Sequence, residues 1–223
     1  MTLPAYSDRP FGAFLFDMDG TVLNSIAVGE RVWTAWALRH NVDVEGLLAI
    51  VHGRKASETI TRLGLSGLDP AEEARLLTLA EIADVEGVDP IAGAVNFLNA
   101  LPRDRWAIVT SAPRDLAAVR LKAAGIPWPP LLITGEDVQK GKPAPDCFRL
   151  AAERLGQPIE QCLVFEDAPA GIEAAQAAGA AVLVISATHR TQLETPHPSI
   201  AGYDGLITDV LSDGSLRLTC KQA

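Results

Sequence analysis

The sequence predicts an α/β fold in which a parallel sheet is interrupted by an all-helical insertion. Two observations support this prediction. Short apolar runs alternate with helical patterns along most of the chain, and the alternation stops between residues 22 and 90. Because strand–helix–strand repeats form parallel sheets with right-handed crossovers, we expect a core domain from residues 1–21 and 91–223. Residues 22–90 are expected to form a separate helical domain.

Each expected strand is a short apolar run without polar alternation, which is typical of strands buried on both faces. These runs are FGAFLF before Asp17, WAIV before Thr110, LLIT before Gly135, CLVF before Glu166 and AVLVI before Ser186. The expected core helices cover residues 113–125, 145–156 and 169–179. Each begins at a proline and ends near a glycine, as helices commonly do.

The insertion contains at least two helical patterns. Ser25 is a suitable N-cap for a helix that continues to residue 40, with Trp33 and Trp36 on one face. These two tryptophans suit either a core or an interface. A second pattern covers residues 71–85. Inserted after the first strand, the helices would lie over the carboxyl ends of the strands, where open α/β sheets bind ligands.

Composition restricts the classes of function. The 223 residues are 48% hydrophobic and 21% charged, as in globular proteins. The net charge of −9 argues against nucleic acids and anionic membranes as partners, because both require clustered Lys and Arg. The three cysteines lack CxxC spacing, which favours a reducing compartment. The apolar run at residues 11–16 is too short for a signal peptide or a membrane span, so we expect a cytoplasmic protein, monomeric or a small homo-oligomer.

The first strand ends in Asp17-Met18-Asp19-Gly20-Thr21. At a strand end, positions i and i+2 project to the same side, so Asp17 and Asp19 can both reach one site, and Gly20 lets the backbone turn closely around it. Two carboxylates this close need a cation, and Mg²⁺ prefers oxygen ligands. Taken alone, the pattern is equally compatible with a turn that carries two solvated acids.

A second acidic pair, Glu166-Asp167, follows the fourth apolar run and precedes a helix. If the first strand is central in the sheet, this pair lies beside Asp17 and Asp19, as a bound Mg²⁺ would require. Without those two acids, the pair would be interpreted as a helix cap that complements the helix dipole.

Residues suited to phosphate binding occur after two other strands. Thr110 and Ser111 precede a helix, where free backbone N–H groups and the helix dipole favour an anion. Lys142 lies in the segment KGKPAP, and a residue before proline favours extended backbone, which could direct its ammonium inward. Each signal is weak alone, because Ser and Thr are ordinary N-caps and most lysines are solvated.

Taken together and in this order, the motifs of residues 11–187 resemble those of the haloacid dehalogenase superfamily. The resemblance implies a Rossmann-like parallel core with a helical cap of the C1 type. His52-Gly53-Arg54 and the string WAIVTSAP are similar to the sugar-phosphate phosphatases of that superfamily. The resemblance therefore implies a Mg²⁺-dependent phosphatase that hydrolyses small phosphate monoesters, such as sugar or polyol phosphates, through an aspartyl-phosphate intermediate.

The resemblance also implies catalytic roles for residues of the core. Asp17 would attack phosphorus, and Asp19 would protonate the leaving alkoxide and then deprotonate the hydrolytic water. Ser111, with Thr110 as its alternative, and Lys142 would bind the phosphoryl oxygens.

For the metal, the resemblance implies Mg²⁺ held by Asp17, the backbone carbonyl of Asp19 and Asp167. Glu166 would orient metal-bound water rather than bind the ion directly. This cation would neutralise the repulsion between the attacking carboxylate and the phosphate.

The cap is expected to select the leaving group, because the core site contacts phosphate and metal alone. His52 and Arg54 are the first candidates for substrate contacts, and Glu30 and Glu86 are weaker ones. Each of these side chains is also compatible with a structural or surface role. Asn24 stands where many relatives carry Asp, a departure that concerns the cap hinge or substrate gate and leaves the core acids intact.

Three alternatives remain at this stage. A receiver-like signalling module also gathers acids, Mg²⁺, a hydroxyl and a lysine around a phosphorylated aspartate, but it lacks the helical insertion. A β-phosphoglucomutase would return the phosphoryl group to a sugar. A dehalogenase would need neither Asp19 nor Asp167, so both residues argue against it.

Overall fold

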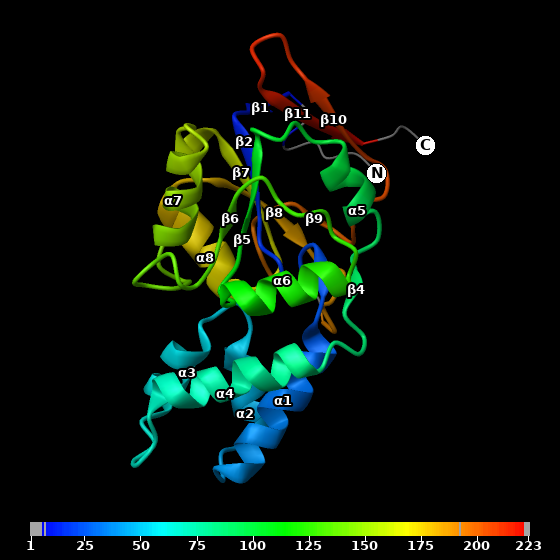
Figure 1. Ribbon diagram of the computed structural model, residues 1–223. Coiled ribbons are helices and arrows are strands. Elements are labelled where there is room, and N and C mark those ends of the chain that lie inside the picture. Colours follow the sequence, from blue (N-terminus) through cyan, green and yellow to red (C-terminus); the bar gives the residue numbers. More distant parts are fainter. Residues whose placement is uncertain (1–5, 7, 192, 221–223) are drawn as a thin grey trace.

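A sheet of six strands, in the order β6-β5-β2-β7-β8-β9, forms the centre of the computed structural model (Figure 1). Each neighbouring pair is parallel, so the predicted parallel α/β fold is confirmed. The structure describes residues 6, 8–191 and 193–220; the remaining ends of the expected core domain lie outside the described residues. The strands are β2 (Ala13–Phe16), β5 (Trp106–Val109), β6 (Leu132–Ile133), β7 (Cys162–Glu166), β8 (Ala181–Ile185) and β9 (Ser199–Ile200).

Helices cover both faces of this sheet (Figure 1). On one face, α7 (Asp146–Arg154) and α8 (Pro169–Ala178) pack against the sheet, with a short 3₁₀ helix, η1 (Ile159–Gln161), between α7 and β7. On the other face lie α5 (Ala94–Asn99) and α6 (Arg114–Ala123). Cover on both faces explains why the strands read as continuous apolar runs.

Aromatic rings form the centre of one face of the sheet. Phe14 and Phe16 alternate with smaller side chains along β2, and Phe16 stacks on Phe165 of β7 with ring centroids 4.4 Å apart. Phe97 of α5 and Tyr203 complete this aromatic cluster. Because residues i and i+2 of a strand share a face, the spacing of the two phenylalanines in β2 places both rings in one core.

Four helices between β2 and β4 gather at the end of the core where the strands finish (Figure 1). They are α1 (Ile26–Arg39), α2 (Val44–Val51), α3 (Ala56–Leu63) and α4 (Pro70–Ala83). Their apolar residues form a hydrophobic cluster separate from those of the sheet. Trp33 and Trp36 belong to it, and the Trp36 indole Nε1 donates a hydrogen bond to Glu73, 2.8 Å away. Both tryptophans are therefore core residues of this helical cluster.

The segment that carries these helices is not helical throughout. β3 (Leu23–Asn24) and β4 (Asp89–Pro90) pair in antiparallel fashion where the chain leaves and re-enters the core. Both strands have two residues and lie outside the apolar runs that identify the other strands, so the sequence pattern did not predict them.

Ser25 meets one expectation in part. It occupies the N-cap position of α1, but its hydroxyl makes no cap hydrogen bond and donates instead to Asp19 Oδ1 at 2.5 Å. The first turn of α1 is capped by Asn24, whose Oδ1 accepts from the Ile26 backbone N–H at 3.1 Å. The expected N-cap position of Ser25 is thus confirmed, but its side chain does not supply the cap hydrogen bond, because the hydroxyl is oriented toward the Asp19 carboxylate.

A second, antiparallel sheet in the order β1-β11-β10 lies at the opposite end of the core from α1–α4 (Figure 1). Its strands are β1 (Pro10–Phe11), β10 (Leu206–Val210) and β11 (Leu216–Cys220). Leu216 and Leu218 join the aromatic face of the core. Across the described ranges, no helix combines the length and apolarity needed to cross a bilayer.

The central aromatic cluster generates a stability prediction. Replacing Phe165, which is fully buried, by alanine (Phe165→Ala) removes ring contacts and leaves a cavity, so we expect the free energy of unfolding to fall by about 3–5 kcal/mol. Urea denaturation measures the change. Trp128→Ala is the control, because Trp128 is 54% exposed and its loss should cost about 0.5 kcal/mol or less. Similar losses for the two variants would contradict the prediction.

Candidate active site

Acidic side chains from two adjacent strands meet at the carboxyl edge of the central sheet. Asp17 follows β2, and Glu166 and Asp167 stand at the end of β7, its parallel neighbour. Each of the three residues offers a carboxylate oxygen, and these atoms all lie within 4.8 Å of one another. The predicted convergence of the two acidic motifs is therefore present in the fold, and the three residues are buried.

Lys142 supplies the positive charge nearest to these acids. Its side chain is 1% exposed, and its Nζ donates to Asp17 Oδ1 at 2.5 Å, Glu166 Oε1 at 2.8 Å and the Val109 carbonyl at 3.1 Å. These bonds use all three hydrogens of the ammonium. Burial alone would lower the pKa of Lys142, but the two carboxylates outweigh it and raise the pKa, so the ammonium stays charged.

One ammonium does not neutralise three carboxylates. Burial raises the pKa of Asp17 to about 8 against the opposing effect of Lys142, with Glu166 and Asp19 adding to the rise. Burial likewise raises the pKa of Asp167 well above its usual range, reinforced by Glu166 and Asp17. A set of buried carboxylate oxygens whose negative charge exceeds the positive charge around it fits a hard divalent cation such as Mg²⁺.

Glu166 and Asp167 are held in different ways. Glu166 Oε2 accepts the backbone N–H groups of Asp167 and Ala168, both at 2.8 Å, so this side chain both caps the segment entering α8 and binds Lys142. Asp167 Oδ1 accepts the Thr21 hydroxyl at 3.1 Å. Gly20 has a φ of +89°, and any Cβ there would overlap the Asp167 carboxylate, so both conformation and space require glycine.

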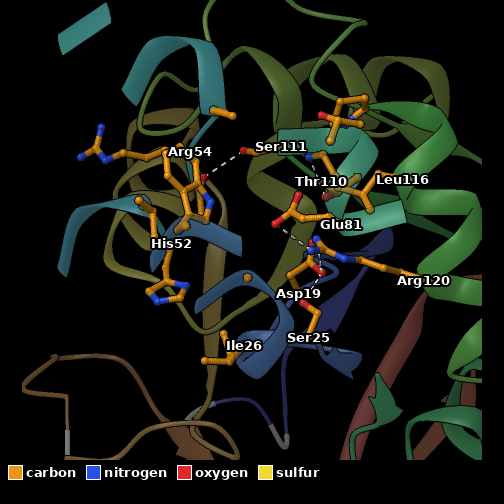
Figure 2. Close-up of a pocket in the computed structure, with 18 of the residues that line it drawn as sticks. Asp19, Ser25, Ile26, His52, Arg54, Glu81, Thr110, Ser111, Leu116 and Arg120 are labelled. Atoms are coloured by element: carbon orange, nitrogen blue, oxygen red, sulfur yellow. Dashed lines mark hydrogen bonds and ion pairs between the residues drawn. The ribbon is translucent and has the colours of Figure 1, made fainter. Parts of the chain in front are cut away.

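The Asp19 carboxylate belongs to a different group of contacts. Its Oδ1 accepts Ser25 Oγ at 2.5 Å and Arg120 Nη1 at 2.9 Å, and Arg120 Nη2 lies 3.1 Å from Glu81 Oε1 (Figure 2). Asp19 thus faces α1, α4 and α6, while Asp17 faces the buried acids.

Sequence reasoning did not identify Arg120 or Glu81. A signal for Arg120 was present, because it shares the buried face of α6 with Leu116, Ala117 and Leu121. A basic residue at an apolar helical position is unusual and points to a buried partner.

Thr110 and Ser111 both line the same cavity as Asp17 and Asp19. The Ser111 hydroxyl donates to the Gly53 carbonyl at 2.9 Å, which joins the end of β5 to the loop between α2 and α3. Thr110 Oγ1 accepts the Ala112 backbone N–H at 3.0 Å. The geometry brings both hydroxyl residues to the site and does not choose between them.

The cavity has a volume of about 100 Å³ and lies between the sheet edge and α1–α4 (Figure 2). His52 and Arg54 line it, whereas Glu30 and Glu86 do not. Burial lowers the pKa of His52, which favours the neutral imidazole. The Arg54 guanidinium is directed away from Asp19 in Figure 2. Glu30 instead pairs with Arg190 at 2.7 Å.

Comparisons with known proteins agree with this geometry. The family model described as haloacid dehalogenase-like hydrolase matches residues 11–179. Hexitol phosphatase A of Escherichia coli strain K12 is 40% identical over 178 residues, which cover 78% of this chain and 82% of that protein. Glycerol-1-phosphate phosphohydrolase 2 of Saccharomyces cerevisiae is 33% identical over 187 residues, which cover 79% and 75%.

Among solved structures, the crystal structure of a hydrolase from Pseudomonas syringae matches with a TM-score of 0.70 at 28% identity. The match covers 78% of this chain and 84% of that one. With a family model that spans most of the sequence and a relative at 40% identity, the resemblance is confirmed, and the chain belongs to the haloacid dehalogenase-like hydrolase family.

Proposed function

We propose that the protein is a Mg²⁺-dependent phosphatase that hydrolyses sugar or polyol phosphates through an aspartyl phosphate on Asp17. The predicted enzyme class, a phosphomonoester hydrolase of this family, is confirmed by the family and by the named relatives. The observation that carries the proposal is the position of Asp17, bound to Lys142 at the end of the central strand beside Glu166 and Asp167.

Asp17 is the proposed nucleophile. The hydrogen bond from Lys142 fixes the orientation of its carboxylate, and the cavity reaches it from the side of the helical cluster. Attack of a carboxylate oxygen on phosphorus would form an acyl phosphate and release the alcohol, which splits one difficult displacement into two easier ones. The hydroxyl of Ser111 or Thr110 is proposed to bind the phosphoryl oxygens, where charge accumulates in the transition state. Lys142 is proposed to join them by exchanging one of its three present hydrogen bonds for a phosphoryl oxygen.

Asp19 is the proposed general acid and base. Its carboxylate lines the cavity and is held by Ser25 and Arg120 on the side of the helical cluster. There it would protonate the departing alkoxide in the first step and take a proton from water in the second.

Asp17, Asp167 and the backbone carbonyl of Asp19 would hold Mg²⁺. When bound, Mg²⁺ supplies positive charge that offsets the repulsion between the nucleophilic carboxylate and the phosphate. Glu166 would not bind the ion directly, because its own oxygens are engaged by Lys142 and two backbone N–H groups; it would instead orient water at the metal site.

We further propose that residues 22–90 act as a cap over a core made of the remaining chain, and that this cap selects the leaving group. His52 and Arg54 are the proposed contacts, since both line the cavity. The names of the hexitol and glycerol phosphate relatives support a small alcohol rich in hydroxyl groups. A cytoplasmic location and a monomeric or small oligomeric state stay predictions.

The nucleophile is tested by Asp17→Asn. An amide cannot attack phosphorus, so we expect no phosphate release above background from a panel of hexitol, sugar and glycerol phosphates, with unchanged circular dichroism. Asp104→Asn, at an exposed aspartate, is the matched control and should retain full activity. Turnover by Asp17→Asn would refute the mechanism.

In the wild-type enzyme, hexose phosphate isomerisation without phosphate release would indicate a mutase, and one stable phosphorylation without turnover would indicate a receiver-like switch.

The acid–base role is tested by Asp19→Asn. Loss of a general acid and base should lower kcat of the folded enzyme by about 10²- to 10⁴-fold. Because Asp19 is paired with the buried Arg120, we also expect the melting temperature to fall, but the folded fraction stays inactive. Steady-state phosphate release and thermal denaturation measure the two quantities. If the variant loses stability but the folded fraction remains active, Asp19 is a structural acid.

The metal site is tested by pH-dependent stabilisation. In the metal-free protein, burial raises the pKa of Asp17 from 3.8 to about 8, so its contribution to stability is full below pH 3.8 and is lost as the pH rises through about 8. Mg²⁺ binds the ionised form and offsets that loss. We therefore expect Mg²⁺ to raise the melting temperature more at pH 8 than at pH 6. Equal stabilisation at both pH values would be incompatible with this site.

The need for the metal in catalysis is tested by chelation. We expect EDTA to abolish phosphate release until Mg²⁺ is restored, and full activity in EDTA would be incompatible with this site.

A further inference from the structure

Arg120 connects the proposed general acid to the helical cluster. Its guanidinium lies between Asp19 Oδ1, 2.9 Å from Nη1, and Glu81 Oε1 of α4, 3.1 Å from Nη2 (Figure 2). We propose that Arg120 is a positioning residue that aligns Asp19 for proton transfer when α4 is seated against α6. This inference rests on the proposed function, because it assumes that Asp19 protonates the leaving group.

Arg120 is poorly explained by packing alone. Its side chain is 7% exposed, in a face of α6 otherwise built from Leu116, Ala117 and Leu121. Burying a guanidinium is costly unless it is fully paired, and an apolar residue of similar volume is often as stable or more so. Within the described part of the chain, the Arg120 Nε has no hydrogen-bond partner. An arginine that is buried but incompletely satisfied suits a role at Asp19 better than a role in stability.

The contacts of Asp19 leave one oxygen for chemistry. Ser25 and Arg120 both donate to Oδ1, and the side chain is 25% exposed where it lines the cavity. Two donors on one oxygen fix the plane of the carboxyl group and leave Oδ2 to carry the transferable proton. Without the Arg120 contact, the Ser25 hydroxyl alone would hold the group, and a single hydrogen bond leaves it free to rotate.

Through the same guanidinium, the orientation of the Asp19 carboxylate depends on the position of α4. Its planar fork presents fixed donors, so both acids must be in place for both nitrogens to be paired. The other polar contacts of α2, α3 and their loop with the core do not touch Asp19: Ser111 donates to the Gly53 carbonyl at 2.9 Å, Lys55 donates to the Val138 carbonyl at 2.7 Å, and Glu58 accepts the Gly141 N–H at 2.8 Å. Among the described residues, Arg120 alone contacts both Asp19 and α4 through hydrogen bonds or ion pairs.

The proposed step identifies a discriminating substrate pair. As an Asp17 oxygen bonds to phosphorus, the bond between phosphorus and the ester oxygen breaks, and that oxygen takes the proton of Asp19. An alkyl phosphate requires this proton because an alkoxide is a poor leaving group. An aryl ester such as 4-nitrophenyl phosphate releases a stabilised phenolate without it. Misalignment of Asp19 therefore impairs the alkyl substrate selectively.

The test compares kcat/KM for glycerol phosphate with kcat/KM for 4-nitrophenyl phosphate, because this parameter covers the steps up to phosphoryl transfer. For Arg120→Met we expect the alkyl-to-aryl ratio to fall by about 10- to 100-fold. Arg120→Lys should restore part of the ratio, and Glu81→Gln should lower it by a smaller factor. Arg190→Met is the matched control: it removes an ion pair between the core and α1 that does not touch Asp19, and the ratio should not change.

Equal losses on both substrates would overturn the inference, because a purely structural defect lowers both reactions together. An unchanged ratio in Arg120→Met would overturn it as well. Should Arg120→Met fail to fold, the ratios of Arg120→Lys and Glu81→Gln decide, and wild-type ratios in both reject the role. If the wild-type enzyme turns over neither ester, the proposed function itself is wrong, which is a different result from a changed ratio between two active reactions.

Discussion

The structure depends on the charge balance around the buried ammonium of Lys142. This one cation is shared by Asp17 and Glu166, and Asp167 lies nearby without a basic partner in the described structure. Removing one member of a buried ion pair generally costs about 3–5 kcal/mol, so Lys142, which is the partner of two buried acids, cannot be exchanged cheaply. An arrangement that gathers more negative than positive charge in the interior is poor for stability and suited to a site that binds a cation and a phosphate.

Much of the core was predictable because its signals are local. Runs such as WAIV and CLVF are continuous in the sequence, and prolines and glycines bound α6, α7 and α8. Asp17 directly follows a strand, and Glu166 is the last residue of another. Because neighbouring parallel strands end at the same edge of the sheet, the two acids could be placed together. β3, β4 and β9 were missed because they have two residues and lie outside the apolar runs, whereas the equally short β6 lies within the run LLIT. The β10–β11 hairpin lies beyond the last run considered.

The contacts of Asp19 could not be predicted for a different reason. They join positions 19, 81 and 120 through three elements whose relative placement is decided by packing, and no spacing rule relates such positions. Ser25 illustrates the same limit at short range. Its hydroxyl suits a helix N-cap, but the fold places a carboxylate within reach, and Asn24 takes over the cap. Local propensity identified the residue type and tertiary context decided its partner.

The short β3–β4 ribbon has a consequence for how such a protein can change. The entire block of four helices leaves and returns through two adjacent, antiparallel stretches, so its covalent attachment to the sheet is confined to one narrow stem. The four helices also have their own hydrophobic cluster, separate from the clusters that pack on the sheet. A foreign block with the same stem spacing could be grafted there without disturbing the strand order of the sheet. Evolution could thus replace α1–α4 by recombination and keep the sheet intact.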